Sequence, residues 1–351
     1  SSLRALQLIE RQRPGFLAAV NVFAGTSAGG INALLMAASA SREQGLERGI
    51  DLWSENPFDP SLVRMVSGAL GCISMYGNEG FVEALRPIFL DTTLGDLAAR
   101  NRFVIVPSFQ LKGREDRVPS WEPVVYHNLG ESPYLDVSVL DVSLRTSAAP
   151  VFLPIYQGHV DGGMFANNPG MAALARVMAN PLRGGGRGVG AQEIRLLSVG
   201  TGQRSSYLAV EDAAWGWQQW LFDPRRPLAL IEAFFSAGTL EIDEQCRTIL
   251  GTKSFFRLNP LQKIDGSSLD LDLEDQYLPD GSPGFERLKT ILQEVVEHSP
   301  ELNPDANGGR VPAVLHWLHQ AGWIEEPRDD REKPGAPAAP RQRRATKAKP
   351  G

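Results

Sequence analysis

Cysteine is scarce in this chain, and long apolar runs and a secretory leader pattern are absent. The 351 residues include two cysteines, Cys72 and Cys246, which lie far apart and in no metal-binding spacing. We therefore expect neither a disulfide framework nor a structural zinc site. No run of about 18 apolar residues exists, and the first residues lack the charged, apolar and small-residue order of a signal peptide. These absences predict a cytoplasmic or peripheral membrane protein.

Charge is distributed unevenly along the chain. The formal net charge is −6, but residues 327–351 hold eight Lys or Arg against three Asp or Glu, so this tail carries +5 and residues 1–326 carry −11. The tail is rich in Pro and Ala, and we expect it to be disordered. It either attracts anionic lipid headgroups or nucleic acid, or serves only as a solubilising segment. The acidic body argues against nucleic acid as the main partner, and residues 1–326 are expected to form one domain.

A serine nucleophile elbow is the most informative motif. The largely apolar residues 18–24 predict a buried strand, residues 30–40 predict a buried helix, and Gly25-Thr26-Ser27-Ala28-Gly29 lies between them. In a strand, sharp turn and helix unit the serine lies at the tip, and flanking glycines let the backbone turn. The N–H of Ala28, which follows the serine, is a candidate oxyanion donor. We therefore interpret Ser27 as a nucleophile.

A serine nucleophile needs a base, and Asp161-Gly162-Gly163 supplies a candidate. The two glycines allow one backbone to pass close to another, which would bring the carboxylate to the serine. An ordinary carboxylate is a weak base, so burial must raise the pKa of Asp161 toward neutrality. The alternative is that Asp-Gly-Gly forms a surface turn.

Apolar runs alternate with helical patterns along the chain. Residues 103–109 form a β-branched run typical of a buried strand, and residues 124–128 are its expected neighbour. Helices are predicted over residues 141–149 and 169–177. Strands that alternate with helices predict an α/β fold with a mainly parallel sheet.

Five segments together resemble the patatin-like phospholipase family. They are the elbow at 25–30, the helix segment Thr146-Ser147-Ala148-Ala149-Pro150, the Asp-Gly-Gly motif at 161–163, Phe165-Ala166-Asn167-Asn168-Pro169, and Leu197-Ser198-Val199-Gly200-Thr201-Gly202. Their order and spacing are similar to those of the family, and the resemblance covers about residues 3–260. It implies a three-layer α/β sandwich around a mainly parallel sheet.

The resemblance also implies an activity. Family members of this kind are lipid acyl hydrolases, of the phospholipase A or lysophospholipase type, that cleave fatty acyl esters without a metal or cofactor. Ser27 is then the nucleophile and Asp161 the general base of a Ser-Asp dyad. Gly25, Ala28 and Gly29 form the elbow and oxyanion site, and Gly162 and Gly163 form the supporting loop. The expected partner is a phospholipid or other acyl lipid, with transient contact with a membrane surface.

The start of the chain departs from the family pattern. Family members begin with a strand and a glycine-rich loop whose N–H groups form the oxyanion hole, whereas this sequence opens at Ser1 with a segment that resembles the helix after that loop. The first strand and loop are therefore expected to be missing. One oxyanion-hole donor is typically worth about 10²–10³ in rate. A catalytically impaired lipid-binding or regulatory protein is thus the alternative function.

Histidines leave a second catalytic alternative open. A Ser-His-Asp triad would require a histidine late in the chain, and His298, His316 and His319 are available. His159, two residues before Asp161, would share the face of a strand with it and could tune its pKa.

An aromatic cluster follows the last family-like segment. It contains Trp215, Trp217, Trp220 and Phe222. Amphipathic rings of this kind prefer a lipid interface, although packing of a second layer on the core is the alternative.

Overall fold

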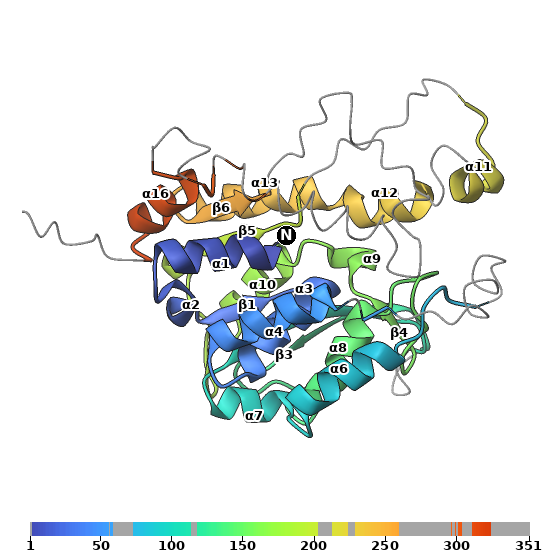
Figure 1. Cartoon of the computed structure of the whole chain (residues 1–351), viewed down its shortest axis with the longest axis horizontal. Helices are drawn as coiled ribbons and strands as arrows, with labels where there is room; N and C mark the ends of the chain where they lie inside the picture. The colour runs from blue at the N-terminus through green and yellow to red at the C-terminus, as the bar shows by residue number, and fades with distance from the viewer. Residues whose placement is uncertain are drawn as a thin grey trace, which may run out of the picture.

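The computed structural model describes residues 2–55, 57–58, 73–113, 118–202, 213–223, 229–259, 296, 299, 301–303 and 311–323. These residues form a mixed α/β structure in which helices cover a central sheet (Figure 1). The expected basic tail at 327–351, and with it the end of the predicted domain, lies outside the described residues.

The main sheet is organised around one long strand. Its members are β1 (Val22–Ala24), β2 (Phe103–Gln110), β3 (Glu122–His127) and β4 (His159–Asp161). Ile105 of β2 pairs with Ala24 on one side and with His127 on the other, and Ser108 pairs with Asp161 and with Val124. The strands β1 and β4 therefore lie one after the other along the same edge of β2, and β3 occupies the opposite edge.

The directions of these strands correct one expectation. β1 runs parallel to β2, but β3 and β4 both run antiparallel to it, so the sheet is mixed and not mainly parallel. Parallel neighbours need a crossover connection of a dozen or more residues, usually a helix. Residues 111–121 between β2 and β3 are too few for such a crossover, and the chain turns back directly.

Side chains of β2 alternate between two apolar cores, as the period of a strand requires. Val104 and Val106 face one core, whereas Phe103 and Ile105 face the other. The first core is covered by α3 (Ala28–Ala38), α4 (Arg42–Ser54), α6 (Glu79–Phe89), α7 (Leu94–Ala99) and α8 (Val139–Ser147). The second core is covered by α10 (Gly170–Ala179). The expected three-layer arrangement is therefore confirmed.

A second sheet extends the molecule beyond this sandwich (Figure 1). Its strands β5 (Leu196–Val199) and β6 (Phe255–Leu258) are parallel. Their side chains share a third core with α1 (Ser2–Gln12) and α16 (Ala313–Gln320). The remaining elements are α9 (Gly163–Ala166), η1 (Ala191–Glu193), α11 (Trp217–Phe222), α12 (Ala229–Ala237) and α13 (Thr239–Leu250).

The strand predicted over residues 18–24 begins later than expected. Only Val22–Ala24 pair as β1, because the chain before them forms a helical turn, α2 (Phe16–Ala19). The two carboxylate oxygens of Glu10 accept hydrogen bonds from the backbone N–H groups of Gly15 (2.6 Å) and Leu17 (2.7 Å), which stabilises the start of this turn. The turn also buries Phe16 and Leu17, two consecutive side chains that a strand would send to opposite faces.

Candidate active site

Ser27 lies at the junction of β1 and α3 in a conformation that few residues adopt. Its φ is 56° and its ψ is −128°, and such backbone strain typically costs about 1–3 kcal/mol. The turn is closed by Gly25, where a Cβ atom would lie 2.0 Å from the carbonyl oxygen of Gly29. Only glycine therefore fits at this position, as the nucleophile-elbow interpretation requires.

The first turn of α3 presents one free donor beside Ser27. The N–H groups of Gly29 and Gly30 donate to the carbonyl oxygens of Thr26 and Ser27, each at 2.9 Å. Among the described residues, none accepts a hydrogen bond from the N–H of Ala28, and this residue is exposed. Unpaired N–H groups at a helix N-terminus bind negative charge. Within the described residues, the Ala28 N–H is therefore an unpaired donor at the N-terminus of α3, beside Ser27.

Asp161 is buried at the end of β4, with 1% of its surface exposed. Its Oδ1 atom accepts a hydrogen bond from the N–H of Gly163 at 2.7 Å. Its Oδ2 atom has no partner with full hydrogen-bond geometry among the described residues. Burial raises the pKa of Asp161 to about 6, and the Ser27 hydroxyl and the Gly163 N–H oppose that rise. The Ser27 hydroxyl thus lies close enough to lower the pKa of Asp161 somewhat, although no hydrogen bond of full geometry reaches Oδ2 within the described residues, and the carboxylate is more basic than an ordinary aspartate.

The topology of the sheet explains why Ser27 and Asp161 come together. β1 ends where Ala24 pairs with Ile105, and β4 arrives from the opposite direction to end where Asp161 pairs with Ser108. These two points on β2 are about 10 Å apart at the usual rise of a strand. Because β1 and β4 share this edge, the elbow and the aspartate meet in the gap between their ends.

Thr146, at the end of α8, fixes both sides of this gap. Its Oγ1 atom donates to the carbonyl oxygen of Pro107 at 2.6 Å and accepts a hydrogen bond from the N–H of Ser27 at 3.0 Å. Its carbonyl oxygen accepts from the N–H of Gly162 at 3.3 Å. Thr146 belongs to one of the family-like segments, but its role was not predicted, because no local pattern signals a contact across 119 positions.

Both glycines after Asp161 lie very close to other parts of the chain, Gly162 to backbone atoms and Gly163 to a side chain. A Cβ atom at Gly162 would lie 2.3 Å from the carbonyl oxygen of Pro107. A Cβ atom at Gly163 would lie 2.3 Å from the ring of Phe235, on α12. The Asp-Gly-Gly segment is therefore a buried, tightly packed loop and not the surface turn that was the alternative.

His159 is engaged in a separate group of polar side chains. Its Nε2 atom lies 2.9 Å from the hydroxyl of Tyr126, and its Nδ1 atom lies 3.0 Å from the carbonyl oxygen of Gln157. Burial lowers the pKa of His159. Burial, Ser27 and Gly163 account for the pKa of Asp161, so the expected tuning by His159 is not observed.

Two of the three late histidines lie away from the aspartate loop. His316 and His319 are exposed on α16, which lies at the left of the view, whereas α9 and β4 lie to the right of its centre (Figure 1). The third candidate, His298, lies outside the described residues. Within the described part of the chain, no group of three or more His, Cys, Asp or Glu side chains is placed to hold a metal ion.

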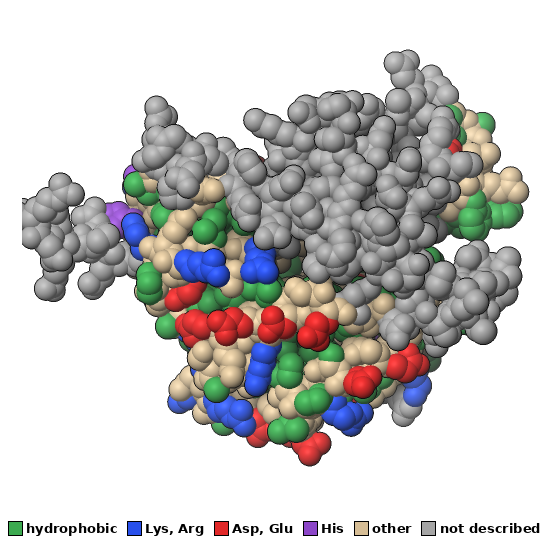
Figure 2. All heavy atoms as spheres, in the orientation of Figure 1, with side chains coloured by type: hydrophobic (Ala, Val, Ile, Leu, Met, Phe, Trp, Pro, Cys, Tyr) green, Lys and Arg blue, Asp and Glu red, His purple; other side chains and the backbone are tan. Residues whose placement is uncertain are grey.

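The aromatic cluster lies on and beside α11. Trp215 packs against Trp220 with ring centroids 5.2 Å apart, and Trp217 packs against Phe222 at 6.1 Å. Trp217 and Phe222 remain 66% and 63% exposed, so they are not buried under a second layer. Figure 2 shows hydrophobic side chains gathered at this margin of the molecule. No helix among the described residues is both long enough and apolar enough to cross a bilayer.

Comparison with known proteins identifies the family of this chain. A family model described as "Patatin-like phospholipase" matches residues 1–174. Protein teg of Priestia megaterium is 30% identical over 282 residues, which are 74% of this chain and 83% of that protein. CotR of Bacillus subtilis is 33% identical over 216 residues, which are 61% of this chain and 62%, less than two thirds, of CotR. A cGAMP-activated phospholipase of Pseudomonas aeruginosa is 29% identical over 262 residues, which are 71% of this chain and 72% of that enzyme. The resemblance noted in the sequence is confirmed, and the chain belongs to the patatin-like phospholipase family.

Proposed function

We propose that the protein is a lipid acyl hydrolase of the phospholipase A or lysophospholipase type, with Ser27 as nucleophile and Asp161 as general base. One observation carries the proposal. A serine with φ of 56° lies beside a carboxylate that is 1% exposed and whose pKa is raised to about 6. Strained serines at elbows and carboxylates with raised pKa values cluster at catalytic sites.

In the first half of the proposed reaction, the Oδ2 of Asp161 takes the proton of the Ser27 hydroxyl. The Oγ atom then attacks the ester carbonyl carbon of the lipid, and the N–H of Ala28 donates to the developing oxyanion. The bond to the alcohol breaks, the proton passes from Asp161 to the leaving oxygen, and an acyl-serine remains.

In the second half, Asp161 takes a proton from water, whose oxygen attacks the acyl carbonyl carbon. The bond between the acyl group and the Oγ atom of Ser27 then breaks, the proton passes from Asp161 to Oγ, and the fatty acid leaves. The raised pKa suits both halves, because a base is most effective when its pKa lies near the working pH. At neutral pH a carboxyl with a pKa of about 6 is mostly ionised, yet it binds a proton far better than an ordinary aspartate. The reaction requires no metal or cofactor.

The proposed substrate is a phospholipid or other acyl lipid, reached by transient contact with a membrane surface. The exposed rings of Trp217 and Phe222 support such contact, since aromatic side chains favour the boundary between water and lipid. The acidic body of the chain makes nucleic acid an unfavourable partner.

Fluorophosphonate labelling tests the proposal, because the probe reacts with an activated serine. We expect labelling of Ser27 and hydrolysis of a fluorogenic phospholipid, with both lost in Ser27→Ala and Asp161→Asn. The labelling rate should rise with pH around a midpoint near 6, since Asp161 must be ionised to act as base.

Two results would contradict the proposal. Labelling that persists in folded Asp161→Asn would remove the aspartate from the mechanism and favour a histidine base. A folded wild-type protein that binds phospholipid vesicles without labelling or hydrolysis would instead favour the catalytically impaired lipid-binding alternative.

A further inference from the structure

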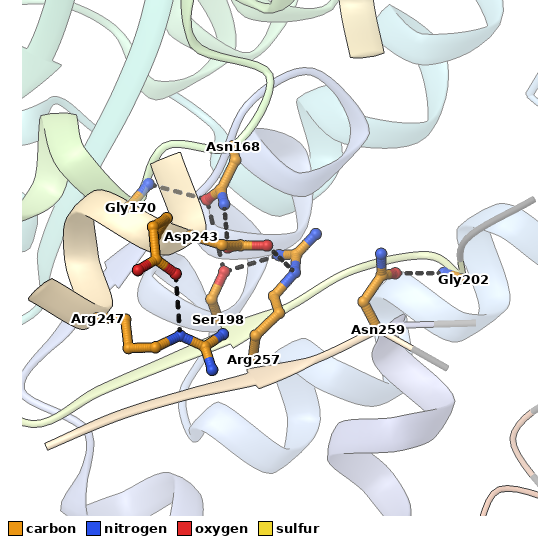
Figure 3. A network of polar contacts seen from close by, with 9 residues as sticks. Asn168, Gly170, Ser198, Gly202, Asp243, Arg247, Arg257 and Asn259 are labelled. Atoms are coloured by element: carbon orange, nitrogen blue, oxygen red, sulfur yellow. Dashed lines mark hydrogen bonds and ion pairs between the residues drawn. The ribbon is translucent and has the colours of Figure 1, made fainter. Parts of the chain in front are cut away.

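Three buried polar side chains, Asn168, Ser198 and Asp243, and the partly buried side chain of Arg257 form a closed ring next to the Asp161 loop (Figure 3). Asn168 Nδ2 donates to Asp243 Oδ1 at 2.8 Å, and Asp243 Oδ2 forms an ion pair with Arg257 Nε at 3.2 Å. The guanidinium of Arg257 donates to the Ser198 hydroxyl at 2.7 Å, and that hydroxyl lies 3.5 Å from Asn168 Oδ1. The ring joins the start of α10, α13, β6 and β5, which are far apart in the sequence.

Burial makes the members of the ring depend on one another. It raises the pKa of Asp243 and lowers that of Arg257, and in each case the partner's charge opposes the shift. A buried ion pair of this kind contributes little net stability, but the loss of one partner is costly because a buried charge is left uncompensated. The Asp243–Arg257 pair adds little to the free energy of unfolding, yet removing one partner would lower it strongly. Such a pair is better explained by the segment whose position it maintains.

The ring holds the end of the segment that connects both sides of the proposed dyad. The helix α9 begins at Gly163, whose N–H donates to Asp161, and it ends at Ala166, whose carbonyl oxygen accepts from the Thr26 hydroxyl at 2.6 Å. Thr26 directly precedes Ser27. Two residues after Ala166, the Oδ1 atom of Asn168 accepts from the N–H of Gly170 at 3.0 Å and turns the chain into α10.

We propose that Asn168, Ser198, Asp243 and Arg257 are positioning residues, which clamp the far end of α9 and so keep Asp161 in register with the Ser27 elbow. The inference rests on the proposed function. Neither Asp243 nor Arg257 touches the dyad, so their action passes through Asn168 and α9. The second sheet and α13 thereby become part of the active site's support.

The variants Asn168→Ala and Asp243→Ala test this proposal by fluorophosphonate labelling of the full chain. Asn168→Ala removes the link from the ring to α9 while the Asp243–Arg257 pair stays intact, so this variant leaves no uncompensated charge. Asp243→Asn is the conservative counterpart of Asp243→Ala: its amide oxygen can still accept from Asn168, although Arg257 loses its counter-ion in both variants. Glu244→Ala is the matched control, because Glu244 follows Asp243 on α13 and lies 3.7 Å from Arg247, but both side chains are exposed.

Labelling should slow by about tenfold or more in Asn168→Ala and Asp243→Ala, because small misplacements of catalytic groups cost rate steeply. For a soluble ester, kcat should fall while KM changes little. Asp243→Asn should label faster than Asp243→Ala, and Glu244→Ala should match the wild type. Hydrogen exchange of the amides in residues 163–170 should accelerate in Asn168→Ala, because the side-chain contact between the end of α9 and the ring is lost.

Wild-type labelling rates in folded Asn168→Ala would overturn the proposal. A wild-type protein that does not label at all would refute the proposed function, and the exchange measurement then decides the inference separately. Unchanged exchange over residues 163–170 in Asn168→Ala would show that the ring does not hold the loop.

Discussion

Asp161 should make the native protein less stable than it would be with a neutral side chain, and the substitution Asp161→Asn measures this cost. The amide is nearly the same size as the carboxyl. Its Oδ1 atom can still accept from the N–H of Gly163, and its Nδ2 atom can donate to the Ser27 hydroxyl. The main change is therefore the loss of a charge that burial disfavours.

The magnitude follows from the pKa. Burial raises the pKa of Asp161 from its ordinary 3.8 to about 6, and a tenfold change in proton affinity is worth about 1.4 kcal/mol. In the unfolded chain Asp161 ionises with its ordinary pKa of 3.8, whereas in the folded chain it ionises only with the raised pKa of about 6. The free energy of unfolding therefore falls as the pH rises from about 4 to about 6. Above that range it is lower by about 3 kcal/mol. Below about pH 4 both states are protonated and no cost remains.

Urea unfolding of the wild type and of Asp161→Asn, measured from about pH 4 to about pH 8, tests this reasoning. We expect similar stability at the acid end and a variant that is more stable by up to about 3 kcal/mol at the alkaline end. Other titrating groups cancel in the difference. A gain in stability that does not depend on pH would show that burial does not raise the pKa of Asp161. A variant that is less stable than the wild type above pH 6 would show the same.

Two further predictions concern the elbow and the surface. Gly25→Ala should abolish labelling and lower the free energy of unfolding by several kcal/mol, about 3 or more, because its Cβ would lie 2.0 Å from the backbone of Gly29. In Gly29→Ala no atom lies within 4 Å of the new Cβ, so this variant should unfold at the same urea concentration as the wild type. Trp217→Ala should reduce hydrolysis of phospholipid vesicles but not of a soluble short-chain ester, since the ring is 66% exposed. Equal loss on both substrates would argue that Trp217 supports the fold and not membrane contact.

Much of the elbow could be predicted from the sequence because its geometry is local. A glycine that permits the close approach at Gly25, a serine at the tip and an apolar helix after it lie within a few residues, and the structure places them as expected. The strand at residues 103–109 was also predicted, because a β-branched run of this length is typical of a buried strand. For Asp-Gly-Gly the residues themselves left two interpretations open, a close backbone approach and a surface turn, and the structure shows the buried loop.

Strand direction could not be predicted in the same way. An apolar run indicates a buried strand but carries no sign of its partner or of the direction of pairing. The antiparallel placement of β3 and β4 on β2 depends on the connection at 111–121 and on contacts with α8. The start of β1 was misplaced for a related reason, since Glu10 stabilises a helical turn in residues whose own pattern favours a strand.

By itself, then, the sequence determined the elements and chemical types of the candidate site: a serine on a strained turn, a carboxylate followed by two glycines, and the helices and strands that carry them. The tertiary structure alone decided how these parts meet. β1 and β4 share one edge of β2. Thr146 accepts a hydrogen bond from Ser27, 119 positions away in the sequence, and Asp243 accepts one from Asn168, 75 positions away. Burial of Asp161, which raises its pKa to about 6, also arises only when the layers pack around it. Local propensities depend on neighbours in the chain, whereas register, burial and electrostatics depend on residues that only folding brings close.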